Sequence, residues 1–260
     1  MPKQDWKKTH TIYWSNELED DFNQTISTRP EVPKDYHYGS KCKFFSWVLY
    51  YLIAKPILGL YCFFHGIKVV GRKNLKRLKG EGAFIYANHV ALSDAFKYQA
   101  YVIPSKRVNI IGYSDTLSLK FVGKLVRGLG YIPIPHDLHN MGKMEDYIKE
   151  CIKKKQYILI FPEAHIWPYY TKIRNFKDVS FHYPASIHAP IIPMVTIWRG
   201  NDKHKPKQTI VIGKPIKPFK GESLKVNKEY LHEQCLLQMK AISEKYSQPE
   251  YIKYIKPEKD

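Results

Sequence analysis

The chain has little that would build a metal centre or a disulfide framework. Its four cysteines are scattered along 260 residues and form no close pair. No metal-ligand spacing is present, and a chain this long does not rely on a disulfide framework. We therefore expect reduced thiols in a protein that faces the cytosol, and no bound metal ion. The cysteines are Cys42, Cys62, Cys151 and Cys235.

The signatures of several function classes are missing as well. Gly123-Lys124 lacks the upstream glycine and the following Ser or Thr of a phosphate-binding loop, and no Gly-x-Ser-x-Gly elbow occurs. The first 40 residues lack the apolar core of a secretory signal. Known nucleic-acid-binding signatures are also absent. These absences argue against a nucleotide cofactor, an esterase triad and nucleic acid as a partner.

Acidic residues are scarce relative to basic ones. The chain has 24 Asp and Glu against 42 Lys and Arg, which gives a formal net charge of +18. Such a chain is attracted to nucleic acid, phospholipid headgroups or acidic carrier proteins, and the charge alone does not choose among them. The hydrophobic content of 44% is typical of a folded domain with one substantial core.

An uninterrupted apolar run of about 20 residues, which a simple membrane crossing needs, is absent too. Residues 44–54 and 57–64 are apolar and aromatic, but a lysine and Pro56 separate them. Because proline breaks or kinks a helix and aromatic residues favour the membrane interface, we predict a membrane-associating helical hairpin over 41–66. The alternative is a hairpin packed on the protein. The flanking cations, which suit an anionic cytoplasmic membrane face, are Lys41, Lys43, Lys68, Arg72 and Lys73.

Strand-like and helix-like patterns alternate beyond this segment. The strand-like runs lie at 67–70, 83–87, 108–112, 131–134, 157–161, 191–198 and 209–212. The helix-like stretches lie at 94–103, 115–128, 141–155, 182–188 and 225–246. The alternation predicts an α/β fold with a mixed, mostly parallel central sheet flanked by helices.

This pattern divides the chain into four parts. We expect a loosely ordered polar lead-in with one short helix at 1–40, followed by the membrane-associating hairpin at 41–66. The α/β domain then spans 67–246. The tail at 247–260 is basic and aromatic, and either touches a membrane or frays.

One histidine stands out within the predicted domain. The apolar run 83–87 ends at Asn88 and His89, and Asp94 follows five residues after the histidine at the start of a predicted helix. This spacing allows the carboxylate to fold back and hold the imidazole as a general base. The alternative is a solvated turn histidine beside a helix-capping aspartate. The pair alone is a weak signal, because about half a coincidental match is expected in such a chain.

Four blocks together resemble the glycerolipid acyltransferases of the 1-acylglycerol-3-phosphate acyltransferase type. Residues 88–94 match the family's Asn-His-x4-Asp block, and 130–136 resemble its second block, a glycine followed by alternating apolar residues. Residues 161–165 resemble the Phe-Pro-Glu-Gly-Thr-Arg block, and 190–195 match a strand with two prolines. The blocks follow the family's order, which is far more specific than any single match.

The resemblance implies a catalytic His89 and Asp94, with Asn88 and Glu163 in the acceptor site. It also shows two departures. His136 stands where the second block has arginine, and Ala164-His165-Ile166 replaces the Gly-Thr-Arg of the third block. The two arginines that hold the acceptor's phosphate in the family are therefore missing. We interpret the chain as a divergent member with an intact base and a rebuilt acceptor pocket.

Nearby cations are candidates to replace those arginines. Lys172 and Arg174 are two residues apart, which places them on the same side of an extended segment, where they could grip a phosphate. His136 and His165 are further candidates. For each, the alternative is an ordinary solvated or structural side chain. Cysteines and carboxylates at useful spacing are missing around the histidines, so no zinc site is predicted.

The sequence thus predicts a membrane-associated acyltransferase on the cytoplasmic face of the cell membrane, peripheral or monotopic. It would move a fatty acyl group from a thioester donor to the hydroxyl of a lysolipid such as 1-acylglycerol 3-phosphate. Acyl-CoA or an acyl carrier protein is the co-substrate, and no other cofactor is expected. Two alternatives stay open. One is a different acceptor, such as glycerol 3-phosphate, another lysophospholipid or a glycolipid. The other is a non-catalytic basic membrane-binding protein.

Overall fold

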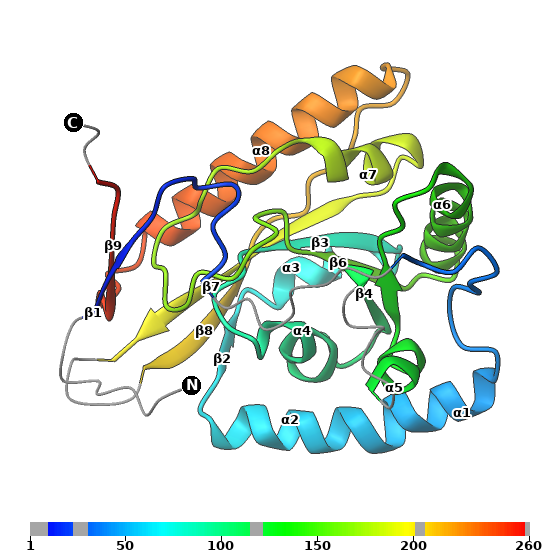
Figure 1. Cartoon of the computed structure of the whole chain (residues 1–260), viewed down its shortest axis with the longest axis horizontal. Coiled ribbons are helices and arrows are strands. Elements are labelled where there is room, and N and C mark those ends of the chain that lie inside the picture. The colour runs from blue at the N-terminus through cyan, green and yellow to red at the C-terminus, as the bar shows by residue number, and fades with distance from the viewer. Residues whose placement is uncertain (1–9, 23–30, 115–121, 201–205, 258–260) are drawn as a thin grey trace.

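A seven-stranded sheet runs through the middle of the molecule (Figure 1). The computed structural model describes residues 10–22, 31–114, 122–200 and 206–257. The strand order is β2-β8-β7-β3-β6-β4-β5, and every pair of neighbours is parallel except β7 and β8. The mixed, mostly parallel α/β sheet is therefore confirmed. The strands are β2 (Lys68–Val70), β3 (Ala83–Ala87), β4 (Val108–Gly112), β5 (Tyr131–Pro133), β6 (Tyr157–Ile160), β7 (Ile191–Arg199) and β8 (Lys207–Ile212).

Helices cover both faces of this sheet (Figure 1). One face carries α6 (Leu138–Lys153), a short 3-10 turn (Val179–Phe181), α7 (His182–Ser186) and α8 (Leu224–Glu244). The other face carries α2 (Lys55–Phe64), α4 (Asp94–Lys97) and the π-helical turn η2 (Tyr98–Val102). Two further helices are α3 (Lys73–Lys76) and α5 (Val122–Gly128). The region 115–121, where a helix was predicted to begin, lies outside the described residues.

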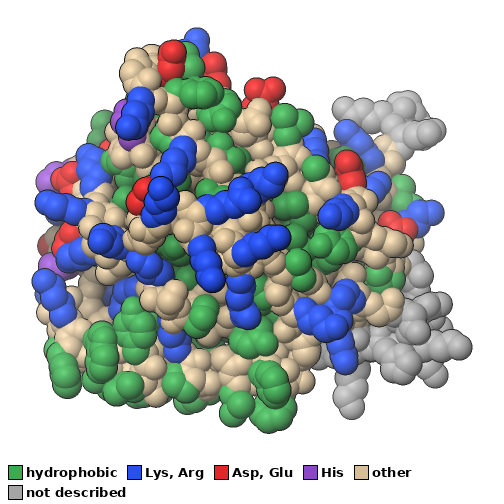
Figure 2. All heavy atoms as spheres, turned by 180° about the vertical axis from the view of Figure 1, so that it is seen from behind, with side chains coloured by type: hydrophobic (Ala, Val, Ile, Leu, Met, Phe, Trp, Pro, Cys, Tyr) green, Lys and Arg blue, Asp and Glu red, His purple; other side chains and the backbone are tan. Residues whose placement is uncertain are grey.

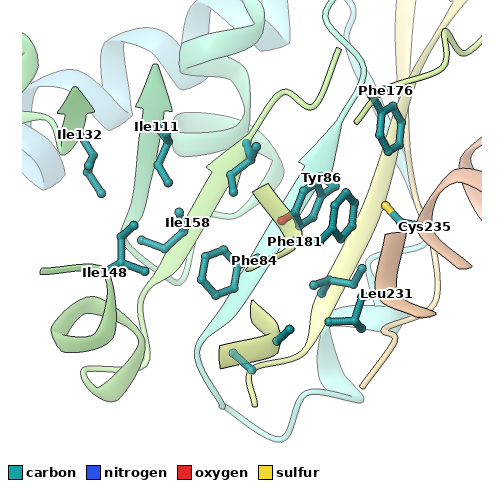
Figure 3. Close-up of a cluster of buried hydrophobic side chains, with 14 of the residues drawn as sticks. Phe84, Tyr86, Ile111, Ile132, Ile148, Ile158, Phe176, Phe181, Leu231 and Cys235 are labelled. Atoms are coloured by element: carbon teal, nitrogen blue, oxygen red, sulfur yellow. The ribbon is translucent and has the colours of Figure 1, made fainter. Parts of the chain in front are cut away.

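Alternation along β3 separates the two cores. Phe84 and Tyr86 point into the cluster under α6, α7 and α8, whereas Ala83, Ile85 and Ala87 point into the cluster under α2 and η2. All five are fully buried, as expected for a central strand with both faces covered. Figure 3 shows the first cluster, in which the Tyr86 ring stacks on Phe181 at 4.1 Å. The strand that precedes His89 is thus fixed on both sides.

The apolar segment is one continuous helix of 22 residues, and the prediction of a hairpin is wrong. It consists of α1 (Lys43–Trp47), the π-helical η1 (Val48–Ala54) and α2. In a regular α-helix the Pro56 ring would meet the carbonyl four residues earlier. The turn before it is wider, since the Lys55 N–H donates to the Tyr50 carbonyl five residues back. This π-helical turn makes room for the ring, so the helix continues through Pro56.

Both ends of the chain contribute to a second, two-stranded sheet. β1 (His10–Tyr13) pairs in parallel with β9 (Ile252–Ile255), as Figure 1 shows beside the end of α8. The described part of the lead-in contains a strand that was not predicted and no helix, and the described part of the tail is paired rather than frayed. Residues 1–9, 23–30 and 258–260 lie outside the described part. Pairing between segments about 240 residues apart leaves no local signal in the sequence.

Candidate active site

His89 lies just beyond the carboxyl end of β3, the middle strand of the sheet. The chain leaves β3 towards β4 on one side and leaves β6 towards β7 on the other. The carboxyl ends of β3 and β6 therefore form a topological switch point, which is where open α/β sheets bind ligands. The loop after β6 carries Glu163, so the first and third sequence blocks meet here.

The imidazole of His89 is held by a carboxylate and a ring. Its Nδ1 lies 3.1 Å from Asp94 Oδ2, and its ring stacks on Phe161 at 4.1 Å with an interplanar angle of 13°. The side chain is 15% exposed, so one edge of the ring remains accessible. With its proton on Nδ1 and shared with Asp94, the neutral imidazole carries its free lone pair on Nε2. This arrangement suits a general base.

Asp94 organises the turn as well as the histidine. Its Oδ2 accepts the backbone N–H groups of Val90 and Ala91, both at 2.8 Å, in addition to the His89 ring. Burial acts to raise the pKa of Asp94, but the Lys97 ammonium and the His89 ring outweigh it, and the pKa is lowered to about 2. Asp94 is thus an ionised, fully buried anchor.

Lys97 is a member of this site that sequence reasoning missed. Its ammonium is fully buried, forms an ion pair with Asp94 Oδ1, and donates to Gln208 Oε1 of β8 at 2.5 Å. A signal was present, because residues three apart on a helix lie on the same face, and Asp94 and Lys97 are so spaced. The site therefore extends from His89 through Asp94 and Lys97 to β8, the second strand from β3.

Glu163 and Arg174 form a second buried ion pair beside the histidine. Glu163 Oε2 accepts the His89 backbone N–H and the Arg174 guanidinium, both at 3.2 Å, and Oε1 accepts the Arg174 N–H at 3.1 Å. Burial raises the pKa of Glu163, while the Arg174 charge and the two backbone N–H groups act to lower it. Arg174 also bonds the carbonyls of His165 and Glu17 and lies over the Trp167 ring. Glu163 thus fixes the backbone of the histidine turn.

Arg174 and Lys172 do not lie on the same side of their segment. Arg174 is fully buried, whereas Lys172 is exposed. The segment forms no strand in the structure, so the two-residue alternation on which the prediction relied does not apply. Because Arg174 is enclosed by Glu163, His165 and Trp167, it is a structural cation and not an exposed phosphate-binding side chain.

Asn88 contacts the sheet instead of a substrate pocket. Its Nδ2 donates to the Thr196 carbonyl at 3.1 Å, and its Oδ1 accepts the Thr196 N–H at 2.8 Å. The side chain is 1% exposed. Asn88 therefore extends the contact between β3 and β7 by one residue and sets where the histidine turn begins.

The two histidines at the ends of the second and third blocks occupy different places. His165 is half-buried, lies 3.3 Å from Asp21 of the lead-in, and packs near the Tyr113 ring at 6.3 Å. His136 is exposed at the end of β5. β5 is three strand spacings from β3, roughly 14 Å. Only His165 therefore belongs to the surroundings of His89.

The loop after β6 is tied to the histidine turn by its backbone. Trp167 N–H donates to the His89 carbonyl at 3.2 Å, and Tyr169 N–H donates to the Val90 carbonyl at 3.3 Å. Ala164 has a φ of 62°, in the left-handed region that glycine adopts without strain, and it stands where the third block has glycine. In this loop the Ile166 N–H has no acceptor among the described residues.

A cavity of about 550 Å³ lies against the histidine turn, between the turn, α2 and the ends of β7 and β8. Its volume is in the usual range of a ligand pocket. The turn Val90–Ser93 forms one wall, and His89 itself is not among the lining residues. Tyr61 and Phe64 of α2 line the cavity towards the exposed apolar helix, and Trp198 of β7 and Gln208 of β8 line it towards the sheet. The described residues contain no group of three or more His, Cys, Asp and Glu side chains that could hold a metal ion.

Comparison with known proteins identifies the family and the fold. Residues 66–197 match the family described as Acyltransferase. Among eight matching chains of solved structures is the 1-acyl-sn-glycerophosphate (LPA) acyltransferase, PlsC, from Thermotoga maritima, at 17% identity and a TM-score of 0.52. The match covers 79% of this chain and 98% of that one, and at such identity it concerns the fold. No curated protein matches the sequence. Because the family match spans half of the chain and includes all four sequence blocks, the protein belongs to the Acyltransferase family.

Proposed function

We propose that the protein transfers a fatty acyl group from a thioester donor to the hydroxyl of a glycerolipid acceptor such as 1-acylglycerol 3-phosphate. The observation that carries the proposal is the His89–Asp94 pair, held at the switch point of the sheet in a chain of the Acyltransferase family. The donor is acyl-CoA or an acyl carrier protein, both of which are anionic and suit the basic surface.

The chemistry follows from the position of the imidazole. His89 Nε2 takes the proton of the acceptor hydroxyl as that oxygen attacks the thioester carbonyl. The tetrahedral intermediate then expels the thiolate, which receives the proton from the imidazolium. Asp94 stabilises the imidazolium through Nδ1, and such a base contributes about 10²–10⁴-fold to the rate. The Ile166 N–H, which has no acceptor among the described residues, is the backbone donor that we assign to the developing oxyanion.

A second candidate is an acceptor other than 1-acylglycerol 3-phosphate, because two of the cations near His89 are already paired. Arg174 is committed to Glu163, and the ring of His165 faces the Asp21 carboxylate. A carboxylate at this position disfavours a second anion nearby. Lys172 is exposed and remains a candidate contact for the acceptor, whereas His136 lies too far along the sheet. Another lysophospholipid, a glycolipid or glycerol 3-phosphate therefore belongs in the same assay.

The cavity beside the histidine turn is suited to an acyl chain. Its walls combine aliphatic and aromatic side chains of α2, the histidine turn and β7. Burying each methylene of a chain there would contribute about 0.8 kcal/mol. Because Tyr61 and Phe64 lead from the cavity to the exposed apolar helix, a lipid chain could enter from a membrane without crossing water.

We also propose that the helix Lys43–Phe64 lies in the plane of one membrane leaflet on the cytoplasmic face. The helix is long and apolar enough to cross a membrane by length and composition. It is, however, bonded to the domain along its length. Ser46 donates to the Gly128 carbonyl at 2.6 Å, Tyr50 accepts the Val108 N–H at 2.9 Å, and Cys62 is buried in the core. A crossing helix would have to break these contacts.

The opposite side of this helix is apolar and exposed. Figure 2 shows hydrophobic side chains gathered along the edge of the molecule where α1 and α2 lie, with Lys and Arg side chains above them. This order of apolar edge and basic collar matches the acyl layer and the anionic headgroups of a membrane surface. The exposed apolar residues are Phe44, Phe45, Trp47, Leu52, Ile53, Ile57, Leu60, Tyr61, Phe63 and Phe64.

The decisive experiment is an acyl-transfer assay on a panel of lysolipids and glycerol phosphates, with acyl-CoA and acyl carrier protein as donors and product mass as the readout. We expect transfer to at least one acceptor and a loss of about 10²–10⁴-fold in His89→Ala. His139→Ala, an exposed histidine of α6, is the matched control and should keep full activity. A His89→Ala enzyme with near-normal transfer would refute the assignment. A wild-type protein that binds vesicles but transfers nothing would favour a non-catalytic membrane protein.

A further inference from the structure

Lys97 is a buried cation directly behind the proposed catalytic pair, and the mechanism above does not use it. Asp94 has its two oxygens divided between two partners. Oδ2 faces the His89 ring at 3.1 Å, and Oδ1 faces the Lys97 ammonium. The ammonium is fixed from its other side by Gln208 Oε1 at 2.5 Å. A cation is therefore locked against the carboxylate that holds the base.

Lys97 is the counter-charge of Asp94, because the other titratable groups nearby are neutral or paired elsewhere. The Tyr98 hydroxyl of η2, near Thr196 Oγ1 at 3.3 Å, stays neutral because burial raises its pKa. From α2, the neighbouring group is the buried thiol of Cys62. Glu163 touches the His89 backbone N–H and has its own counter-charge in Arg174. Among the described residues, Lys97 is the one fixed cation in contact with Asp94.

A buried ion pair is a costly way to hold a turn in place. Removing two charges from water costs free energy that their attraction only partly returns, and well-packed apolar residues of similar volume often stabilise a fold as well. An aspartate could also hold His89 without Lys97, since it already accepts two backbone N–H groups. The ammonium must therefore be judged by what its charge does to the imidazole.

We propose that Lys97 is a positioning residue that sets how readily His89 takes up a proton. An uncompensated carboxylate against Nδ1 would favour the imidazolium, and a protonated His89 cannot accept the proton of the acceptor hydroxyl. The ammonium offsets the carboxylate charge while leaving Oδ2 free to accept the Nδ1–H bond. The imidazole is then held through Nδ1 without facing an uncompensated negative charge. The catalytic consequence rests on the proposed acyl transfer, whereas the electrostatic effect does not.

The test combines nuclear magnetic resonance with kinetics on the full chain. The His89 imidazole is titrated in 15N-histidine-labelled wild type and variants, with its signals assigned from the spectrum of His89→Ala. We expect the midpoint in Lys97→Met to move to higher pH by about one unit. The acid limb of the pH–rate profile should move with it by the same amount. Lys97→Arg, which keeps the charge, should restore the wild-type midpoint.

Two further variants keep the proposal decidable. Gln208→Glu gives the Lys97 ammonium a second carboxylate and leaves Lys97 in place. It should also move the midpoint of the His89 titration to higher pH, and it replaces Lys97→Met as the test if that variant does not fold. Lys149→Met, on the exposed face of α6, should shift nothing. An unchanged midpoint with activity lowered equally at every pH would mean that Lys97 only supports the fold, and would overturn the proposal. A shift to lower pH would also overturn it, because Asp94 would then have taken the proton.

The two proposals fail separately. The titration needs no substrate, so a wild-type protein without transferase activity contradicts the proposed function and leaves the titration result standing. An active wild type whose titration midpoint does not respond to Lys97→Met contradicts the role of Lys97 alone.

Discussion

At the scale of single residues, Arg174 shows how burial changes the role of a side chain. The guanidinium touches Glu163, the His165 carbonyl, the Glu17 carbonyl and the Trp167 ring. Glu163 in turn holds the backbone N–H of His89. Arg174 therefore acts on the active site through the shape of the histidine turn, and a bound phosphate would have to displace its present partners.

Arg174→Met should accordingly lower the free energy of unfolding by about 3–5 kcal/mol, because it leaves the Glu163 carboxylate buried without its counter-charge. Urea unfolding followed by circular dichroism measures the change. Lys172→Met is the matched control and should stay within about 0.5 kcal/mol, since Lys172 is exposed. A stable Arg174→Met protein with a raised KM only for phosphate-bearing acceptors would show instead that the guanidinium binds substrate.

Asp94 predicts a pH dependence of stability whose sign is set by its environment. Its pKa is lowered from 3.8 to about 2, with burial opposing and Lys97 and His89 driving the shift. A carboxylate with a depressed pKa in the folded state stabilises the protein fully above the unfolded pKa, and this stabilisation is lost as the pH falls from 4 to 2. The contribution is about 2 kcal/mol at neutral pH.

The measurement compares wild type with Asp94→Asn by urea unfolding. The stability gap, which is the free energy of unfolding of wild type minus that of Asp94→Asn, should shrink by about 1 kcal/mol between pH 6 and pH 3. Glu163 is present in both proteins, so its own titration cancels. Asp146→Asn, at an exposed ion pair of α6, should show a gap that is independent of pH. A gap of constant size in Asp94→Asn would mean that Asp94 is not ionised in the folded protein.

The sequence predicted the His89–Asp94 pair because both residues lie within one turn, where spacing alone fixes the geometry. It did not predict Lys97 as part of the site, although the i, i+3 spacing was visible, because its second partner Gln208 lies 111 residues away. Arg174 and Asn88 were assigned to the substrate for a similar reason. Their burial depends on Glu163 and Thr196, which the fold alone brings near.

At the scale of elements, the helix Lys43–Phe64 has two unlike sides. One side is bonded to α5 through Ser46, to β4 through Tyr50 and to the chain before β4 through Lys55. The other side carries the exposed apolar residues. Deleting the segment would therefore remove part of the core along with the membrane contact, and point changes on the exposed side are the sharper test.

Ile57→Glu combined with Leu60→Glu should release the protein from vesicles. The two side chains are exposed on the folded protein, so their replacement leaves the core intact. Each would contribute about 1.5–3 kcal/mol when buried in lipid, so the partition onto vesicles should fall at least tenfold. Sedimentation with anionic vesicles measures it. Leu138→Glu, an exposed leucine of α6, is the control. Unchanged sedimentation of the double variant would show that this side of the helix does not enter the membrane.

Regular elements were predictable where the pattern was local and periodic. All seven strand-like runs became strands of the central sheet, because short, nearly continuous apolar runs fit a sheet covered on both faces. The hairpin failed at Pro56, where π-helical turns absorb the proline that the sequence rules treat as a break. β1 was not predicted, since its pairing with β9 depends on the opposite end of the chain.

At the scale of the whole molecule, the apolar helix, the cavity and the histidine turn form one continuous path. Tyr61 and Phe64 begin it at the exposed helix, and Val90 to Ser93 end it at the turn. The lead-in and tail close the other side of the loop after β6, where Trp14, Phe22 and Tyr254 pack around Trp167. The cavity is therefore the side from which a lipid chain would reach the histidine turn.

This path predicts that the size of the cavity sets the preference for acyl-chain length. Trp198 is buried in its wall, so Trp198→Leu should enlarge it and raise kcat/KM for a donor two carbons longer, relative to the preferred donor, by up to about tenfold. The measurement is a competition between acyl-CoA donors of different length, scored by product mass. Trp47→Leu makes the same change on the exposed side of α1 and should leave the ratio unchanged. A folded, active Trp198→Leu protein with the wild-type length profile would place the acyl chain outside this cavity, because the substitution enlarges the cavity and leaves His89 and Asp94 unchanged.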